Sequence, residues 1–408
     1  MKQRFSLLVG FMLIVGCAAA YMIVTSSQRS SSERETGESR SLSVWIYSEE
    51  LAGFFDRYEE EHPGVNVNLR VFRSWRTLYE ELLTAVSANA APQVAEIGST
   101  YGVMQLVNRG AMLPAGERIG RDLREFVSEP FLAAFSNKGE MWAVPLGGSV
   151  PVLYDNRNLF GAAQLDEKLL DWTAIGVAGT ALTKDIDQDG LTDIWGLVAD
   201  ANMAWHHLNM AYDSSLGGRS EERIYESFER WREYLNEDRI TPPLQHQLAM
   251  SQFIYGKAGM LLGTSRKRPT LEKFIGGKFE FGVLPLPGEP GQADLLPEIS
   301  GLAVLASASG NEDLAWECVG YMLEESVQSR LMRDASLIPA RGDVADRLLR
   351  SGELTERENA IMRLKDRFAV KYPTVDDEGM WNKYTGDQEW LESSPAVSPE
   401  ALGKRLRH

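Results

Sequence analysis

Hydrophobic and polar residues follow two periods along the chain, and together they predict alternating strands and helices. Residues 42–48 alternate between apolar and polar side chains, which is typical of a short strand, and residues 49–62 then place apolar side chains at helical spacing. Pro63 and Gly64 break that helix before a second alternating segment. The succession continues with elements predicted at residues 65–72, 76–90, 93–99, 100–110, 195–200, 205–215, 220–236, 258–264, 279–287, 299–306 and 311–326.

Strands that alternate with helices predict an α/β fold in which mainly parallel sheets are covered by helices. With 408 residues, of which 44% are hydrophobic, the chain is long enough for two packed domains. Open sheets of this type bind ligands at the carboxyl ends of their strands. Functional residues are therefore expected immediately after the predicted strands.

The first 25 residues have the pattern of an export segment, because Lys2 and Arg4 precede an apolar run over residues 5–25. One interpretation is a lipoprotein signal, since residues 14–17 resemble a lipobox that ends at Cys17, the residue that would carry the lipid. The other is an uncleaved anchor, since the run is as long as the ~20 residues that cross a bilayer. Both interpretations place the body of the chain outside the cytoplasmic membrane.

Residues 26–41 are rich in serine and charged residues, which predicts a flexible tether between the export segment and the body. The chain has 58 acidic and 42 basic residues and a formal net charge of -16, which disfavours binding to nucleic acid. Only Cys17 and Cys318 could form a disulfide, so none is expected within the mature body.

The order of segments over residues 42–341 resembles the bacterial extracellular solute-binding proteins of ABC importers, in particular the sugar-binding, maltose-binding-like group (family 1). Each matching segment is short, and their order over some three hundred residues makes the resemblance specific. The segments that carry it are residues 43–48, 54–67, 91–115, 139–160, 253–264, 281–288 and 299–341.

This resemblance implies a periplasmic-binding-protein-like fold, with two α/β lobes around a ligand cleft that are joined by a hinge. It places the first lobe at about residues 42–150 plus 285–350 and the second at residues 151–284. The expected hinge crossings are residues 150–158 and 284–298. Residues 351–408 form a C-terminal helical extension that could cap the cleft, pack on the first lobe or serve a partner.

Sugar recognition requires flat aromatic faces and fixed hydrogen-bonding groups in a concave site. Trp45 could equally be a core residue, and Ser48 and Glu50 could instead cap the following helix. Ser99 and Thr100 have a helix start as their alternative role. The complete set of candidate ligand-binding residues is Trp45, Ser48, Glu50, Ser99, Thr100, Tyr101, Trp205, Thr264, Arg266 and Arg341.

The resemblance bears on three of these candidates: it supports Trp205, whereas Thr264 and Arg266 are candidates because they follow the end of a predicted strand. Similar proteins present an aromatic ring to the cleft near the position of Trp205. They often carry a tryptophan shortly after the strand at residues 258–264, where this chain has Thr264, Ser265 and Arg266. Arg266 also belongs to a basic run, residues 265–268, which is more typical of a solvent-facing segment.

An acidic segment after residue 184 has the spacing of a calcium-binding loop. Carboxylates stand at its positions one, three, five and nine, and Gly190 at position six would allow the tight turn. Position twelve is Gly196 instead of the usual glutamate, so a weak structural site is expected; a solvated acidic turn is the alternative. The predicted calcium ligands are Asp185, Asp187, Asp189, the carbonyl of Leu191, and Asp193.

The resemblance implies a monomeric receptor that captures a mono- or oligosaccharide between its lobes and delivers it to an ABC permease, with the membrane as a second partner through the N-terminal anchor. Alternatives are a sensing module for a membrane signalling partner, or a receptor for a peptide or polyamine. The sequence contains no nucleophile elbow, zinc-binding helix motif or phosphate-binding loop, so neither an enzyme such as a glycosidase nor a required cofactor is expected.

Overall fold

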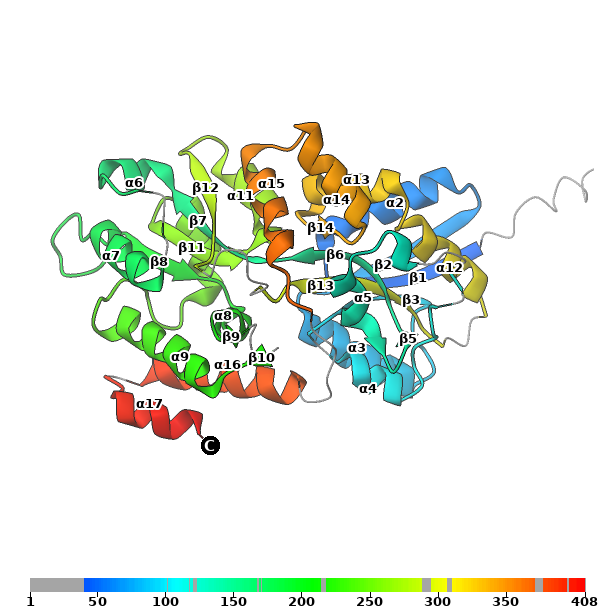
Figure 1. Ribbon diagram of the computed structural model, residues 1–408, viewed down its shortest axis with the longest axis horizontal. Coiled ribbons are helices and arrows are strands. Elements are labelled where there is room, and N and C mark those ends of the chain that lie inside the picture. The colour runs from blue at the N-terminus through cyan, green and yellow to red at the C-terminus, as the bar shows by residue number, and fades with distance from the viewer. Residues whose placement is uncertain are drawn as a thin grey trace, which may run out of the picture.

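The computed structural model describes residues 40–407, except residues 101, 117, 120–122, 167–168, 170, 214–217, 288–294, 307–309, 371–376 and 395. Figure 1 shows two lobes side by side, each with strands inside and helices outside. The expected export segment with Cys17, the tether up to residue 39, and Tyr101 lie outside the described residues. Within the described part of the chain, no helix is both long enough and apolar enough to span a bilayer.

The first lobe is built on a six-stranded sheet with the strand order β14-β6-β13-β3-β1-β2. Leu42, Val44 and Ile46 alternate along the first strand and are fully buried, as the two-residue period predicts. The strands are β1 (Arg40–Ile46), β2 (Val65–Val71), β3 (Val94–Gly98), β6 (Val144–Ser149), β13 (Glu298–Val304) and β14 (Ile338–Pro339).

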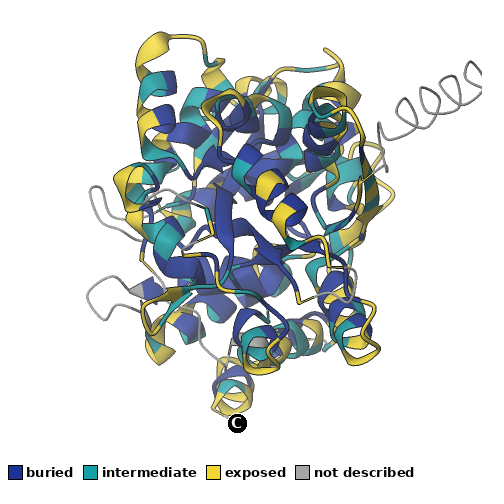
Figure 2. Cartoon of the chain, turned by 90° about the vertical axis from the view of Figure 1, so that its right-hand side faces the viewer, coloured by how far each residue is buried: buried dark blue, intermediate teal, exposed yellow. Residues whose placement is uncertain are grey.

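Helices cover the faces of this sheet, and Figure 2 shows buried strands at its centre with exposed residues on the outer helices. The helices are α2 (Ala52–Glu61), α3 (Trp75–Ser87), α4 (Val103–Asn108), α5 (Glu129–Phe135), α12 (Glu312–Tyr321), α13 (Glu325–Ala335) and α14 (Gly342–Ser351), with short 3-10 turns η1 (Glu49–Leu51) and η2 (Leu123–Glu125). A small hairpin pairs β4 (Ser136–Asn137) with β5 (Glu140–Met141).

The second lobe is built on a four-stranded sheet, β12-β7-β11-β8, formed by β7 (Pro151–Asn156), β8 (Trp195–Ala199), β11 (Ala258–Thr264) and β12 (Phe281–Pro285). Gly196 lets this sheet approach a helix closely, because a Cβ there would lie 2.0 Å from the carbonyl oxygen of Gly179. The other elements are α6 (Arg157–Ala162), α7 (Trp172–Leu182), α8 (Met203–Met210), β9 (Tyr212–Asp213), β10 (Gly218–Arg219), α9 (Glu221–Asn236), η4 (His246–Leu248), α10 (Ala249–Ile254), η5 (Ser265–Lys267) and α11 (Arg268–Ile275).

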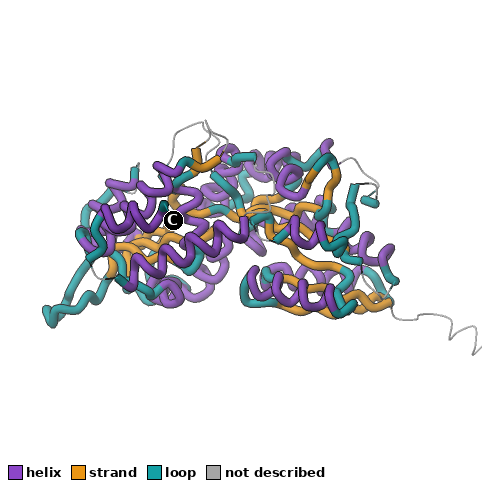
Figure 3. The backbone as a smooth tube through the Cα atoms, turned by 90° about the horizontal axis from the view of Figure 1, so that it is seen from below, coloured by secondary structure: helices purple, strands orange, loops and turns teal. Residues whose placement is uncertain are grey.

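The two-lobed α/β fold is confirmed, but the expectation of mainly parallel sheets is wrong. In the two larger sheets, parallel pairing joins β1 to β2, β1 to β3 and β8 to β11. In contrast, β13 is antiparallel to β3 and β6, and β7 is antiparallel to β11 and β12. The reason is the hinge: β7 and β13 carry the chain into a lobe from the hinge, so they run against neighbours that point toward it. Figure 3 shows the lobes from below.

The C-terminal extension packs mainly on the second lobe, and not on the first lobe as one of the three alternatives expected. It consists of α15 (Glu356–Arg363), η6 (Leu364–Arg367), α16 (Asp377–Ser393) and α17 (Pro399–Leu406). Helix α16 lies against α8 and α9, and α17 lies against α9 (Figure 1). Near the start of α16, Asn382 accepts a hydrogen bond from Arg76 in α3 of the first lobe. The extension therefore contacts both lobes.

Buried polar residues attach α16 to the second lobe. The carboxylate of Glu392 accepts hydrogen bonds from Trp231 Nε1 at 2.8 Å and from the backbone N–H of Leu244 at 2.6 Å, and it pairs with His246 Nε2 at 2.8 Å. His207 Nε2 pairs with the Gln388 side chain at 2.6 Å. Since these groups lie on different elements, the position of α16 depends on the second lobe being folded.

This attachment should make folding stability sensitive to acid. Burial lowers the pKa of His207 to about 4, whereas a histidine in the unfolded chain titrates near 6.5. Between these pH values the unfolded chain binds a proton that the folded chain does not. The contribution of the neutral His207 to the free energy of unfolding is therefore complete above about pH 6.5. It is lost as the pH falls toward the folded-state pKa, and the full loss is about 3 kcal/mol. His246 acts in the opposite direction. Burial lowers the pKa of His246, but the hydrogen bond and charge of Glu392 raise it more, so the net change is an increase. The contribution of His246 to the free energy of unfolding is therefore lost as the pH rises.

Urea unfolding at pH 7.5 and pH 5 measures this effect. The wild-type chain should lose more stability between the two pH values than a His207→Gln variant. A His62→Gln variant serves as the control, since His62 is only partly buried. An identical pH dependence in the wild type and the His207→Gln variant would exclude His207 as the source.

Candidate functional site

Polar side chains gather where β1 and β3 end and β13 begins. These strands are neighbours in the first sheet, and the antiparallel β13 starts beside the end of β3. The arrangement brings together Tyr47 and Ser48 after β1, Glu96 in β3, and Glu298 at the start of β13. Of these, Ser48, Glu96 and Glu298 are buried.

The carboxylate of Glu96 is satisfied within the first lobe. Its Oε2 accepts hydrogen bonds from the backbone N–H groups of Tyr47 and Ser48, both at 2.8 Å. Its Oε1 accepts the Ser48 hydroxyl at 2.6 Å and also the Ser300 hydroxyl. A buried carboxylate with four hydrogen bonds does not depend on a cation from the other lobe.

The second lobe contributes Asp200, which follows β8, and Arg266, which follows β11. These two strands are parallel neighbours, so their ends lie at the same edge of the sheet. Asp200 Oδ1 accepts a hydrogen bond from the backbone N–H of Asn202 at 3.0 Å and pairs with His206 Nε2 at 2.9 Å. Burial raises the pKa of the Asp200 carboxyl, but His206 and the charge of Lys267 bring it below its usual value.

Arg266 reaches across from the second lobe to the first. Its Nη1 donates a hydrogen bond to Ser48 Oγ, its Nη2 lies 3.9 Å from Glu96 Oε1, and its Nε lies 4.0 Å from Glu298 Oε2. The Arg266 side chain is only 6% exposed. The interpretation of residues 265–268 as a solvent-facing basic run is therefore wrong for Arg266, because the end of β11 meets the other lobe.

Among the buried polar atoms of the second lobe that lack a hydrogen-bond partner in the described part of the chain are Arg266 Nε, Arg266 Nη2 and Asp200 Oδ2. A buried polar atom without a partner costs about 1–3 kcal/mol of stability, so native structures keep few of them. Both residues contribute a charge that acts on Tyr47 and Glu298 of the first lobe. The unpartnered donors and acceptor thus belong to a site between the lobes.

The electrostatics of this site reflect both lobes. Burial raises the pKa of the Glu298 carboxyl, the charge of Arg266 lowers it, and Glu96 and Asp200 raise it further, with a net increase. Burial and the charge of Glu298 raise the pKa of Tyr47. The phenol of Tyr47 therefore remains a neutral hydrogen-bonding group at physiological pH.

Aromatic rings border the polar site. The rings of Tyr47 and Trp75 lie 4.6 Å apart at an angle of 38°. Trp75 is held there as the first residue of α3, whose N-cap Ser74 accepts a hydrogen bond from the backbone of Thr77. In the second lobe, the ring of the buried Trp205 lies 5.8 Å from that of His206. The partly buried rings of Tyr47 and Trp75 are suited to contact the apolar face of a sugar, whereas Trp205 and His206 are only 1% and 0% exposed.

Several residues predicted from the sequence lie at or beside this site. Ser48 and Arg266 are in direct contact. Thr264 is buried at the end of β11, where its carbonyl accepts the Tyr154 hydroxyl at 2.8 Å. Ser99 exchanges hydrogen bonds with the backbone of Ile299, the neighbour of Glu298, and Thr100 is buried.

Other predicted residues are not brought into this cluster. Trp45 packs against Phe72 at 5.2 Å with Arg70 over its ring, on the side of β2. Arg341 pairs with Asp343 at 2.6 Å and lies over Phe126. Glu50 is a partly buried residue of η1.

The sequence interpretation missed six residues of the site: Tyr47, Trp75, Glu96, Asp200, His206 and Glu298. A signal was present for two of them, because Glu96 and Glu298 are acidic residues within or next to otherwise apolar strand segments. A charge in a buried strand needs partners, so such a position is a candidate for function or for a hydrogen-bonded network. Tyr47 directly precedes the predicted Ser48.

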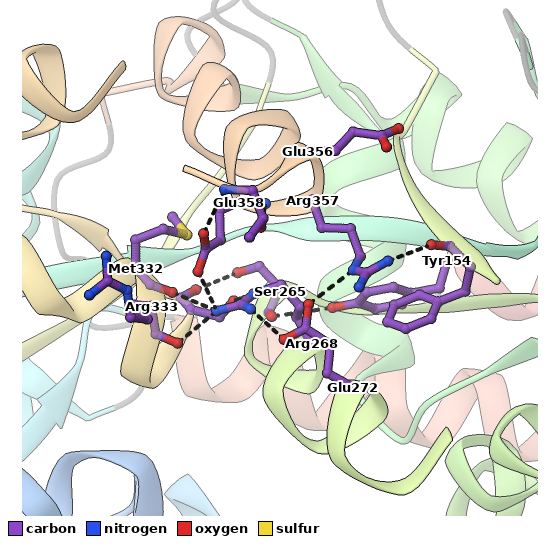
Figure 4. Close-up of polar contacts among 12 residues, drawn as sticks. Tyr154, Ser265, Arg268, Glu272, Met332, Arg333, Glu356, Arg357 and Glu358 are labelled. Carbon is purple, nitrogen blue, oxygen red and sulfur yellow. Dashed lines mark hydrogen bonds and ion pairs between the residues drawn. The ribbon is translucent and has the colours of Figure 1, made fainter. Parts of the chain in front are cut away.

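A second polar cluster, centred on Arg268, holds the lobes together at the hinge (Figure 4). Arg268 Nη2 donates to the carbonyls of Met332 and Arg333 at the end of α13, both at 2.8 Å, and Nε donates to Ser336 Oγ at 2.8 Å. Arg268 also forms ion pairs with Glu272 at 2.6 Å and with Glu358 of the extension at 3.4 Å. Unlike Arg266, this guanidinium is fully engaged, which indicates a structural role.

The acidic loop brings some of its predicted calcium ligands together. Carboxylate oxygens of Asp185, Asp187 and Asp193 lie within 4.8 Å of one another, and all three residues are exposed. Asp189 instead accepts the backbone N–H of Leu191 at 2.8 Å. Gly190 has a φ of 90°, the tight-turn conformation expected of it.

Comparison with known proteins adds to this geometry. The profile of the family described as bacterial extracellular solute-binding protein matches residues 47–329. A binding protein of Brucella abortus (strain 2308) is 20% identical over 328 residues, which cover 77% of this chain and 79% of that protein.

Two solved structures share the fold. An ABC transporter solute-binding protein from Thermotoga lettingae, bound with α-D-tagatose, has a TM-score of 0.76 at 15% identity, with 90% of this chain and 98% of that chain covered. The maltose/maltodextrin-binding domain from Bdellovibrio bacteriovorus, bound to maltotriose, has a TM-score of 0.74 at 17% identity, with 90% and 97% covered.

Proposed function

Because the chain belongs to the bacterial extracellular solute-binding protein family, we propose that it captures a mono- or oligosaccharide between its lobes and delivers it to an ABC permease. The observation that carries this proposal is the site itself. Buried polar groups of both lobes meet there, and Arg266 Nε, Arg266 Nη2 and Asp200 Oδ2 have no hydrogen-bond partner among the described residues. A solute between the lobes would supply those partners and join the lobes at the same time.

The choice of a sugar as the solute has two supports. Two proteins of the same fold were solved with tagatose and with maltotriose. The site also combines aromatic rings at Tyr47 and Trp75 with the charged side chains of Arg266 and Asp200. Aromatic faces beside fixed donors and acceptors fit a molecule that has apolar ring faces and several hydroxyl groups.

A thermal-shift screen of the protein with mono- and oligosaccharides tests the proposal, with peptide and polyamine pools as competing solutes. A bound sugar at about one hundred times its Kd should stabilise the fold by about 2.7 kcal/mol, because it binds only the folded chain. Stabilisation by a peptide or polyamine pool, with none by any sugar, would reject the sugar and retain the receptor. Release of bound sugar unchanged supports binding without catalysis, whereas bond cleavage would contradict it.

Membership of the family implies an extracytoplasmic location, and the tether to the membrane is a further part of this proposal. Residues 1–25 would supply it, either through a lipid on Cys17 or as an uncleaved helix. Mass spectrometry of the mature N-terminus distinguishes them: a diacylglyceryl-modified Cys17 indicates the lipoprotein, and an intact residue 1 indicates the anchor. Recovery of an unmodified, cleaved chain in the soluble fraction would contradict both.

We include in the proposal a structural calcium ion in the loop of Asp185, Asp187 and Asp193. Oxygen ligands on a tight turn suit calcium, and the ion would relieve repulsion among the carboxylates. Calcium should therefore raise the melting temperature of the wild-type chain and have a smaller effect on an Asp187→Asn variant. Asp313→Asn, at an exposed acid elsewhere, is the control. Equal melting temperatures in calcium and in chelator would exclude the site.

A further inference from the structure

We infer that the site between the lobes selects its solute by charge: it accepts neutral and amino sugars and rejects sugar acids and sugar phosphates. This inference rests on the proposed function and specifies the class of sugar. The residues that would impose the selection are Asp200 and Glu298, one from each lobe. Both are buried, at 6% and 3% relative exposure.

The first argument concerns hydrogen bonding. Arg266 Nε and Nη2 can only donate, while Asp200 Oδ2 can only accept, because its carboxyl is ionised. A solute that satisfies all three atoms must present oxygen acceptors to Arg266 and an O–H or N–H donor to Asp200. Hydroxyl groups do both, and an amino group provides additional donors. A carboxylate or phosphate dianion placed beside Asp200 presents acceptors alone, so it cannot give Asp200 Oδ2 the donor that a hydroxyl or amino group at the same position would supply.

The second argument concerns the balance of charge. Among the described residues, three buried carboxyl groups, Glu96, Asp200 and Glu298, face one buried guanidinium, Arg266, and the imidazole of His206, which is already paired with Asp200 at 2.9 Å. That guanidinium already lies within 4.0 Å of two of them, so its charge is not free to balance an added anion. Lys267 also acts on Asp200 but is only partly buried, so solvent screens its charge more strongly. An anionic solute would therefore be placed against like charge in a region with little water.

The two lobes would share the selection. The Glu96 carboxylate accepts four hydrogen bonds within its own lobe, two on each oxygen, so its acceptor sites are occupied. Within its own lobe Glu298 has the Ser149 hydroxyl at 3.4 Å and a hydrogen bond from the Trp75 side chain, fewer hydrogen bonds than Glu96 accepts. Asp200 keeps one oxygen unpartnered. The carboxyl groups that remain open to a donor are therefore Asp200 and Glu298.

Isothermal titration with matched sugars tests the inference. The probes are glucose, glucosamine, glucuronate and glucose 6-phosphate, together with the corresponding galactose series and the oligosaccharides found in the thermal-shift screen. In the series that binds, the neutral or amino sugar should bind at least about tenfold more tightly than the acid or phosphate, since like charges placed together are costly. Tighter binding of the acid or the phosphate would overturn the inference.

Isosteric variants assign the selection to its residues. Asp200→Asn and Glu298→Gln keep the shape of each side chain and remove its charge, so each should reduce the preference for the neutral sugar over its acid by about tenfold. Asp343→Asn, at a half-exposed carboxylate that pairs with Arg341 outside the site, is the matched control and should leave the ratio unchanged. An unchanged ratio in both site variants would overturn the assignment.

The outcomes separate this inference from the function on which it rests. If acids bind best, the protein remains a sugar receptor and the charge selection alone is wrong. If no sugar of any charge binds, the sugar assignment is wrong and the selection is rejected with it. If both site variants fail to fold, the wild-type comparison of neutral sugar with acid still decides the inference.

Discussion

An Arg266→Ala variant should bind its sugar about one hundredfold more weakly than the wild-type chain and should still fold. The weaker binding follows from the loss of two unpartnered donors and of the hydrogen bond to Ser48 that joins the lobes. Charge-assisted hydrogen bonds in a buried site are worth about 1.5–3 kcal/mol each, and one hundredfold in Kd corresponds to about 2.7 kcal/mol. Titration calorimetry with the sugar that stabilises the wild type measures the change.

Folding should be retained because the first lobe does not need Arg266. The Glu96 carboxylate keeps its four hydrogen bonds, and the Ser48 hydroxyl still donates to it. Arg230→Ala, which removes a partly exposed arginine of α9, is the control for loss of a cation from the same lobe. An Arg266→Lys variant should fall between alanine and the wild type, since lysine keeps the charge and loses the forked geometry. An unchanged Kd in the alanine variant would remove Arg266 from the site.

The largest loss of stability among single substitutions at the lobe interface is expected for Arg268→Met. Its guanidinium satisfies two carbonyls at the end of α13 and the Ser336 hydroxyl, and it pairs with Glu272 and Glu358. Methionine fills similar space but leaves the buried Glu358 and the carbonyls without a donor. Removing one partner of a buried ion pair costs about 3–5 kcal/mol. Guanidinium chloride unfolding measures the difference.

Arg330→Met provides the matched control for the hinge. Arg330 lies on α13 itself and pairs with Asp334 at 2.6 Å, but its side chain is 35% exposed. A surface pair of this kind contributes about 0–1 kcal/mol, so this variant should unfold close to the wild type. Similar losses in both variants would mean that Arg268 is not a special connection between the lobes.

The hydrophobic pattern was sufficient to predict most of the elements and the α/β class. Leu42, Val44 and Ile46 alternate in the sequence and are buried in β1, because the strand period fixes which face meets the core. The pattern did not predict strand direction. Each strand reads the same in either direction, and the antiparallel course of β7 and β13 follows from how the chain crosses between lobes.

The site was predicted less completely than the fold. Ser48 and Arg266 follow strands, and the rule that ligands bind at strand ends identified both. Trp45 was chosen for its chemistry, but it lies within β1, between the buried Val44 and Ile46, and its side chain contacts Phe72 and Arg70. The basic run around Arg266 favoured solvent exposure instead, because the charges of neighbouring residues in the sequence do not reveal that the other lobe lies opposite Arg266.

By itself, the sequence determined the alternation of elements, the acidic character of the chain and the kind of side chain available at each strand end, because these depend on residues close together in the chain. Only the tertiary structure decided which of those ends meet. Glu96, Glu298 and Ser48 come together through sheet order, and Arg266 and Asp200 face them through the hinge. A solute site made by two lobes depends on contacts such as that between Ser48 and Arg266, which are 218 residues apart in the sequence, and no local period specifies such contacts.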